Sequence, residues 1–209
     1  MAAGWIAFAL VLPFFLNDFF FAVAVEAEAW LFVDYATKAL VLYAALWLVF
    51  VKRLNQAELG LNPLPRSPFL RWTAVLTLLG VAIDQLVPLA LGPWFPSWRF
   101  FSFPELYDDR ILYLDLSFGL ALTAVAEEVI FRGLLVFMLL ARYQNAAVAV
   151  VVSSLLFGLM HWGLGPALVI NAFLWGLLPA LSVIKTRSIY PAVVAHYVTN
   201  FVDFSGLGL

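Results

Sequence analysis

Three stretches of this sequence place ionisable or amide side chains in otherwise apolar surroundings. Their members are Glu127, Glu128, Arg132, His161, His196 and Asn200. A charged side chain in such a setting is costly, so it usually pairs with another charge or serves a function. Glu128 and Arg132 are four residues apart and can pair on one helical face. Glu127 points in another direction, so it is a surplus carboxylate and a candidate for chemistry.

These groups suit the hydrolysis of an amide bond if they converge in one polar cavity. Glu127 could act as a general base on a water molecule that it holds together with His161. His196 and Asn200 could donate hydrogen bonds to the developing oxyanion. The carboxylate and the two imidazoles could instead ligate a divalent metal such as zinc. The chain has no cysteine and no His-Glu-x-x-His pattern, and its residues leave both chemistries open.

The composition indicates where such a site lies. Of the 209 residues, 65% are hydrophobic and only 11% are charged, whereas a soluble domain is about a quarter charged. This balance excludes a soluble globular enzyme and a disordered chain. The same composition excludes a nucleic-acid binder; the net charge of −2 itself says little about partners, and the Lys and Arg residues form no polybasic tract. The absence of cysteine excludes disulfides and thiolate metal ligands.

We predict an all-α fold, a polytopic transmembrane helix bundle with its active site in a polar intramembrane cavity. About 20 apolar residues cross a bilayer as a helix. About seven candidate spans cover residues 4–25, 30–51, 72–91, 111–141, 146–162, 166–184 and 189–204. Residues 1–209 form a single integral membrane domain in this prediction, and 111–204 form a catalytic core of four spans. Asn17-Asp18 interrupts the first span, which we expect to be kinked or divided into two halves.

Two long loops separate these spans. Prolines forbid a continuous helix through residues 52–71. The loop at 92–110 is rich in aromatic residues, which favours an anchor at the membrane interface. The loops alternate in charge, with one side carrying Lys52, Arg53, Arg66, Arg71, Arg142, Lys185 and Arg187 and the other only Arg99 and Arg110. The positive-inside rule then places the N-terminus in the cytoplasm and the C-terminus outside.

Depth along the predicted spans allows the site residues to meet. Counted from the cytoplasmic side, Glu127 and His161 lie roughly 21–23 Å along their helices. Asn200 lies roughly 17 Å and His196 about 11 Å along the last span. We therefore expect the four side chains to converge in one cavity within the bilayer.

Further charges inside the spans have simpler interpretations. Asp34 and Lys38 are four residues apart and are expected to form a structural pair. Asp203 is seven residues after His196, close to the same helical face, and could orient its ring. The other acids, Asp18, Asp84 and Asp115, are expected near span ends or along the cavity.

The three patterns resemble those of the CPBP family of intramembrane proteases, which includes the Ras-converting type of CAAX endopeptidase. The family pattern is Glu-Glu-x-x-x-Arg, Phe-x-x-x-His and His-x-x-x-Asn, and Phe157 precedes His161 here as the pattern requires. The sequence Ser-Ile-Tyr-Pro ahead of His196 also resembles the family's lead-in. The resemblance covers residues 120–200 and leaves the first three spans without a recognised motif.

The resemblance implies a glutamate-dependent intramembrane endopeptidase. It implies Glu127 as general base, His161 as its partner on the water, and His196 with Asn200 as oxyanion donors. Glu128 and Arg132 would maintain the architecture of the site. Family members cleave prenylated CAAX tails, process bacteriocins or act on C-terminal sorting signals in bacteria, and the family has also been labelled metalloprotease. The implied partners are the bilayer and a membrane-anchored peptide or protein, and no cofactor is required unless zinc participates.

Two further expectations complete the sequence analysis. The short chain is similar in size to compact prokaryotic members, which implies an inner, or plasma, membrane location. The alternative to a protease is a non-proteolytic membrane module, either a transporter or proton relay or an immunity-type scaffold, because these also need buried Glu and His. Repeated halves with broken helices would mark a transporter.

Overall fold

The computed structural model describes residues 2–23, 27–51, 59–95 and 108–207, and most of these residues are helical. The first three helices are α1 (Ala2–Val23), α2 (Ala27–Val51) and α3 (Arg66–Leu91), with the short 3-10 turn η1 (Gly92–Trp94) after α3. A continuous rod follows, made of α4 (Asp109–Leu114), η2 (Asp115–Gly119), α5 (Leu120–Glu127), η3 (Glu128–Leu135) and α6 (Val136–Tyr143). The chain ends with α7 (Ala146–Leu159), the 3-10 turn η4 (Trp162–Leu164), α8 (Pro166–Thr186) and α9 (Tyr190–Phe204).

The helices confirm the predicted all-α class within the described residues, where the one β feature is an isolated bridge between Leu61 and Ser188. Three of the described helices are long and apolar enough to cross a membrane, namely Glu28–Val51, Arg66–Trp94 and Pro166–Thr186. The rod from α4 to α6 is about 50 Å long at 1.5 Å per residue, more than a bilayer core requires. The predicted total of about seven spans is not established by these findings.

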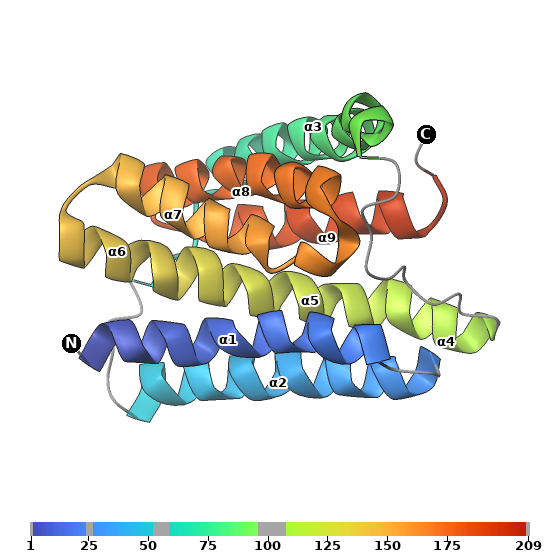
Figure 1. Cartoon of the computed structure of the whole chain (residues 1–209). Helices are drawn as coiled ribbons and strands as arrows, with labels where there is room; N and C mark the ends of the chain where they lie inside the picture. Colours follow the sequence, from blue (N-terminus) through green and yellow to red (C-terminus); the bar gives the residue numbers. More distant parts are fainter. Residues whose placement is uncertain (1, 24–26, 52–58, 96–107, 208–209) are drawn as a thin grey trace.

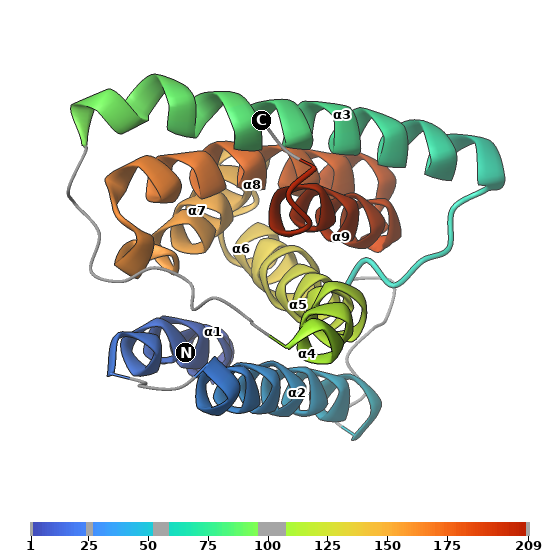
Figure 2. The same ribbon diagram turned by 90° about the vertical axis from the view of Figure 1, so that its right-hand side faces the viewer.

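The rod lies in the middle of the bundle (Figure 1, Figure 2). The antiparallel pair α1 and α2 packs on one side of it. Helices α7 and α8 form a second antiparallel pair on the other side, and α3 lies across α8 and α9. Residues from the first half of the chain therefore surround the rod together with residues from the last three helices.

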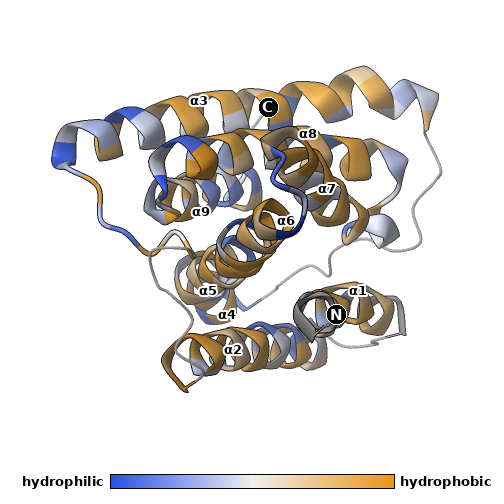
Figure 3. Ribbon diagram, turned by 90° about the vertical axis from the view of Figure 1, so that its left-hand side faces the viewer, coloured by the Kyte–Doolittle hydropathy of each residue, from blue (hydrophilic) through white to orange (hydrophobic). Residues whose placement is uncertain are grey.

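The outer surface is apolar, as expected for a protein that faces lipid. Large hydrophobic side chains are exposed on α2 and α3, among them Phe32 at 75% and Leu78 at 72% of full exposure. Figure 3 shows hydrophobic colouring along these helices. A soluble monomer rarely exposes apolar patches of this extent. The polar side chains that matter for function are instead inside the bundle.

The structure excludes one of the two alternatives for the first span and moves one predicted boundary. Helix α1 continues through Asn17, so the alternative of two half-spans is excluded. The Asn17 amide donates a hydrogen bond to Asp34 Oδ1 on α2 at 2.7 Å, so this polar side chain is accommodated without a break in the helix. Helix α3 begins at Arg66 and not near residue 72. Pro68 lies in its first turn, where proline is tolerated because the N–H groups there have no intrahelical partner.

The two predicted loops are described in part. Residues 59–65 are not helical, as the prolines predicted, and Gly60 accepts a hydrogen bond from Ile189 N at 2.9 Å. The aromatic loop is described only as far as Phe95 and again from Asp108. Its remaining residues 96–107, with Arg99 and most of the predicted interfacial aromatics, lie outside the described part, as do Lys52, Arg53 and the side chain of Asp18.

Turn residues fix the ends of the helices around the site. Helix α7 begins after Asn145, whose side chain accepts a hydrogen bond from Val148 N at 3.2 Å, as an N-cap does. Gly165 has a φ of 95°, which a residue with a Cβ rarely adopts, and Pro166 then begins α8. This sharp connection from α7 to α8 contains His161 and determines where its ring lies.

Candidate active site

The central rod changes its winding at the acidic pair. Glu127 is the last residue of α5, and Glu128 is the first residue of the π-helical segment η3. A π-helix bonds residue i to i+5, is rare, and is frequently found at functional sites. Both carboxylates are buried, Glu127 at 5% and Glu128 at 0% exposure.

Glu128 and Arg132 form a fully buried ion pair, as the sequence predicted. The distance from Arg132 Nη1 to Glu128 Oε1 is 3.4 Å, and both side chains have no exposed surface. The guanidinium also stacks over the Phe157 ring with 4.0 Å from Cζ to the centroid. Gly176 makes room for it, since a Cβ there would lie 3.2 Å from Arg132 Nη2. This pair anchors the rod to α7 and α8.

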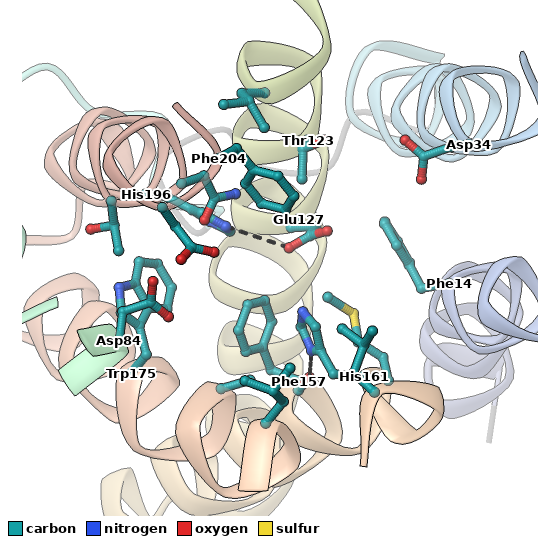
Figure 4. A pocket seen from close by; sticks show the side chains of 18 of the residues that line it. Phe14, Asp34, Asp84, Thr123, Glu127, Phe157, His161, Trp175, His196 and Phe204 are labelled. Carbon is teal, nitrogen blue, oxygen red and sulfur yellow. Dashed lines mark hydrogen bonds and ion pairs between the residues drawn. The ribbon is translucent and has the colours of Figure 1, made fainter. Parts of the chain in front are cut away.

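His196 lies between the two glutamates. Its Nδ1 is 2.9 Å from Glu128 Oε1, and its Nε2 is 3.6 Å from Glu127 Oε2 (Figure 4). The indole of Trp175 packs against the imidazole with 4.5 Å between ring centroids. Because a carboxylate accepts hydrogen bonds, Nδ1 carries the proton in the contact with Glu128. Glu128 therefore orients His196 and directs Nε2 toward Glu127.

His161 is held by a different contact. It follows the end of α7 at the start of η4, so the prediction that both histidines lie within helical spans was wrong for this one. Its Nδ1 is 2.9 Å from the carbonyl oxygen of Phe157, four residues earlier. Since a carbonyl only accepts, Nδ1 is the donor and Nε2 of the neutral ring has a free lone pair. The Phe-x-x-x-His spacing thus sets the tautomer of the histidine.

Helix α9 presents a polar stripe to the same space. His196, Thr199, Asn200 and Asp203 recur at the spacing of one helical face, and all four line one cavity. His196 and Asn200 therefore share a face, as expected. The described contacts of His196 are with Glu127 and Glu128, so the predicted orientation of its ring by Asp203 is not what the structure shows.

The cavity has a volume of about 190 Å³ and lies between the rod, the α1–α2 pair and α3, α8 and α9. It is large enough for several water molecules, each of which takes roughly 30 Å³ in the liquid. The four predicted catalytic side chains, Glu127, His161, His196 and Asn200, all line it. Glu128 and Arg132 lie behind this wall and do not line it. The structure brings the predicted residues together, and their catalytic roles stay predictions.

Sequence reasoning missed much of the remaining lining, which has no motif of its own. On the α1–α2 side, Lys38 Nζ bonds Asp34 Oδ2 at 2.6 Å and Thr123 Oγ1 at 2.7 Å. The predicted pair of Asp34 and Lys38 therefore exists, but it also borders the cavity. The spacing of four residues on α2 is the one sequence signal for this part of the lining, because it predicts that Asp34 and Lys38 pair.

Asp84 and Asp115, which were expected near span ends or along the cavity, both line it, and so does Trp175. Asp115 accepts from the Tyr35 hydroxyl at 2.6 Å, and Asp84 accepts from the Asn171 amide at 2.7 Å. Trp175 is four residues after Asn171 and faces the same space. The sequence gives these residues no visible link to His196 because the contacts join helices far apart in the chain.

The described residues of the site do not form a ligand set for the divalent metal considered as an alternative. The described residues contain no group of three or more His, Cys, Asp or Glu side chains placed to hold a metal ion. Both ring nitrogens of His196 face carboxylates, which leaves Nε2 of His161 as the available imidazole ligand. We therefore derive no step of the reaction through a metal.

Comparison with known proteins finds one similarity, in the second half of the chain. Residues 110–202 match the family model described as Rce1-like, type II CAAX prenyl endopeptidase Rce1-like. No curated protein and no solved structure matched the chain. The matched segment contains Glu127, Glu128, Arg132, His161, His196 and Asn200, and α1, α2 and α3 precede it. The segment 110–202 is therefore similar to Rce1-like CAAX proteases, which is consistent with the family resemblance of the three motifs.

Proposed function

We propose that the protein is an intramembrane endopeptidase that hydrolyses a peptide bond next to a membrane-associated segment of its substrate. The observation that carries this proposal is the meeting of Glu127, His161, His196 and Asn200 around one cavity inside an apolar bundle. The CAAX protease family supports proteolysis in general. The glutamate-activated water and the substrates below are our proposal.

In one protonation state of the site, the charges of four ionisable side chains cancel, and this state suits the proposed reaction. Glu127 and Glu128 carry two negative charges, Arg132 carries one positive charge, and an imidazolium at His196 supplies the second. In this state Nδ1–H of His196 donates to Glu128, and Nε2–H points toward Glu127 and the cavity. A neutral cluster is favoured in surroundings of low dielectric constant, where an uncompensated charge is expensive.

Glu127 is the general base of the proposed reaction. A water molecule in the cavity donates one hydrogen bond to Glu127 and a second to the free Nε2 of His161. Glu127 removes its proton as the water oxygen attacks the carbonyl carbon of the substrate. Nε2–H of His196 and the Asn200 amide donate to the oxyanion. The proton on Glu127 then passes to the departing amine as the C–N bond breaks.

The proposed substrates are membrane-associated C-terminal segments, either CAAX-like tails or bacterial sorting signals. The test uses purified protein in liposomes with prenylated CAAX peptides and peptides that carry a C-terminal membrane segment. Wild type should cleave at least one of them, and Glu127→Gln and His161→Ala should each lose cleavage. Asp109→Asn is the matched control, because this exposed carboxylate at the start of α4 is outside the cavity.

Two outcomes would overturn the proposal. Cleavage that persists in Glu127→Gln and His161→Ala would refute the assigned site. Cleavage that a chelator abolishes and zinc restores would replace glutamate activation by metal chemistry.

A transporter or proton relay is the second candidate, because several carboxylates border the cavity. A break of the first helix at Asn17-Asp18 would have suggested a transporter. No such break is present, since α1 continues through Asn17. Proton flux through liposomes that depends on Glu127, without cleavage of any peptide, would favour this candidate.

The proposed setting is a prokaryotic inner membrane that the chain crosses about seven times with its N-terminus in the cytoplasm. The distribution of Lys and Arg over the loops supports this orientation.

A further inference from the structure

A second group of acids lies in the cavity on the side away from Lys38. Asp84 of α3 borders the site beside Trp175 and His196, and Asp34 approaches from the opposite side of Glu127 (Figure 4). Asp203 lies on α9 at the exposed edge of the same cavity. Asp84 is close enough to interact electrostatically with both His196 and Asp203.

Neither of these two carboxylates forms an ion pair among the described residues, and the charge of His196 is already opposed by the two glutamates. The ion pairs recorded there join Asp34 to Lys38, Glu128 to Arg132, and His196 to the two glutamates. Asp34 and Asp115 differ from these two, since Lys38 forms an ion pair with the first and interacts electrostatically with the second. Among the described residues, no lysine or arginine compensates the negative charge at the Asp84 side.

Buried acceptors without partners lie next to these carboxylates. The Asn171 side chain is 5% exposed and lines the cavity, and its Nδ2 donates to Asp84 while its Oδ1 has no hydrogen-bond partner. Thr199 is 3% exposed, also lines the cavity, and its Oγ1 has no partner either. Buried polar atoms are normally hydrogen-bonded, and the Asn171 Oδ1 can only accept, so it points to an occupant that donates, while the Thr199 hydroxyl can accept or donate.

The occupant that fits is an organic cation with several N–H donors. Carboxylates and an amide oxygen accept hydrogen bonds, and a lysine ammonium or arginine guanidinium supplies both the donors and the missing positive charge. A metal ion fits less well, because no three of the described His, Cys, Asp and Glu side chains are placed to hold one.

We propose that Asp84, Asn171 and Asp203 form a subsite that binds a lysine or arginine side chain of the substrate close to the bond that is cleaved. This subsite rests on the proposed endopeptidase function. Asp203 at the exposed edge attracts the basic side chain, and Asp84 with Asn171 holds it beside His196 and Glu127. The three residues come from α3, α8 and α9, so α3, which precedes the matched family segment, contributes to specificity.

The first test is a set of membrane-anchored fluorogenic peptides in which each position around the cleaved bond carries Lys, Gln or Glu in turn. At one position, wild type should cleave the Lys peptide with a kcat/KM about tenfold or more above the Gln peptide, the gain of a charge-assisted hydrogen bond. Asp84→Asn should reduce this Lys-to-Gln ratio to near one. The isosteric amide still accepts from Asn171, so the change removes charge with little change in shape.

Asp115→Asn is the matched control. It removes a carboxylate that lines the same cavity but binds Tyr35, so the Lys-to-Gln ratio should not change. Equal cleavage of Lys and Gln peptides at every position by wild type would refute the subsite while leaving the protease proposal intact. A ratio that survives in Asp84→Asn, or falls equally in Asp115→Asn, would also refute it.

A second measurement tests the subsite without cleavage. Thermal unfolding of Glu127→Gln protein in detergent is followed with n-hexylammonium and with n-hexanol as an uncharged control. The subsite predicts that the ammonium raises Tm relative to the alcohol, since a ligand that binds the folded state stabilises it, and that Asp84→Asn removes this difference. An equal response to both compounds would refute the subsite. Failure of the protease proposal appears separately, as absence of cleavage by wild type.

Discussion

At the scale of single residues, Phe157 connects the parts of the site. Its carbonyl oxygen fixes the tautomer of His161, and its ring contacts the rings of His161, His196 and Trp175 and the Arg132 guanidinium. The sequence predicted the pair of Glu128 and Arg132 from their spacing. It could not predict that His196 contacts both glutamates, because this contact depends on how α9 packs against the rod.

The buried ion pair leads to a prediction about stability. Arg132→Met removes the cation next to Glu128 and leaves a carboxylate without its charge partner, which costs about 3–5 kcal/mol of unfolding free energy. Unfolding by SDS in mixed micelles measures this loss. Arg142→Met is the control, because Arg142 is exposed at the end of α6 and its loss should change stability by less than about 0.5 kcal/mol. A loss below about 1 kcal/mol for Arg132→Met would contradict the ion pair.

The tautomer of His161 can be measured directly because the chain has only two histidines. In protein labelled with ¹⁵N at histidine, we expect one neutral ring protonated at Nδ1 with an unprotonated Nε2. The signal should persist in His196→Gln, which assigns it to His161. A His161 ring protonated at Nε2 would contradict the contact with the Phe157 carbonyl and the proposed hydrogen bond from water to Nε2.

At the scale of elements, the turn from α7 to α8 positions His161. Gly158 lets the two helices approach, because a Cβ there would lie 2.7 Å from the carbonyl oxygen of Val169 and 3.0 Å from the backbone nitrogen of Phe173. The sequence placed His161 inside a span. Its apolar surroundings hide the end of α7, which a 3-10 turn and Gly165 produce.

Gly158→Ala should therefore separate α7 from α8. Backbone atoms cannot move aside as a flexible side chain can, so we expect a loss of about 1–3 kcal/mol in unfolding free energy. Cleavage should fall as well, because His161 lies three residues further on. Gly92→Ala is the control with no atom within 4 Å of its new Cβ. If both variants unfold like wild type, the close approach of α7 and α8 is wrong.

At the scale of the whole molecule, residues from both halves of the chain enclose one cavity. The sequence predicted the site residues of the second half better than those of the first. Spacing and the family resemblance predicted the residues of the matched segment 110–202, and hydropathy predicted the helices. Asn17, Asp34, Lys38 and Asp84 precede that segment, and their approach to Glu127 follows from packing between distant helices. Local sequence patterns do not predict such packing, so this part of the site could be found only from the structure.

The topology gives a prediction at this scale, tested in a chain without native cysteine. Gln144 lies at the turn between α6 and α7, and Leu207 follows α9 at the other end of the bundle (Figure 1). In intact bacterial cells, a membrane-impermeant maleimide should label Leu207→Cys, whereas Gln144→Cys should react only after permeabilisation. The positive-inside rule is the reason, since Arg142, Lys185 and Arg187 lie at the Gln144 end. Labelling of both from outside would contradict the predicted orientation.

The central claim is that Glu127 activates the water, and single-turnover cleavage of one reconstituted substrate peptide tests it most directly. Glu127→Gln keeps the size of the side chain but removes the base. The account predicts that its rate falls about 10²–10⁴-fold below wild type, while the unfolding transition stays within the range of the Asp109→Asn control. A folded Glu127→Gln protein that cleaves within tenfold of the wild-type rate would contradict the account.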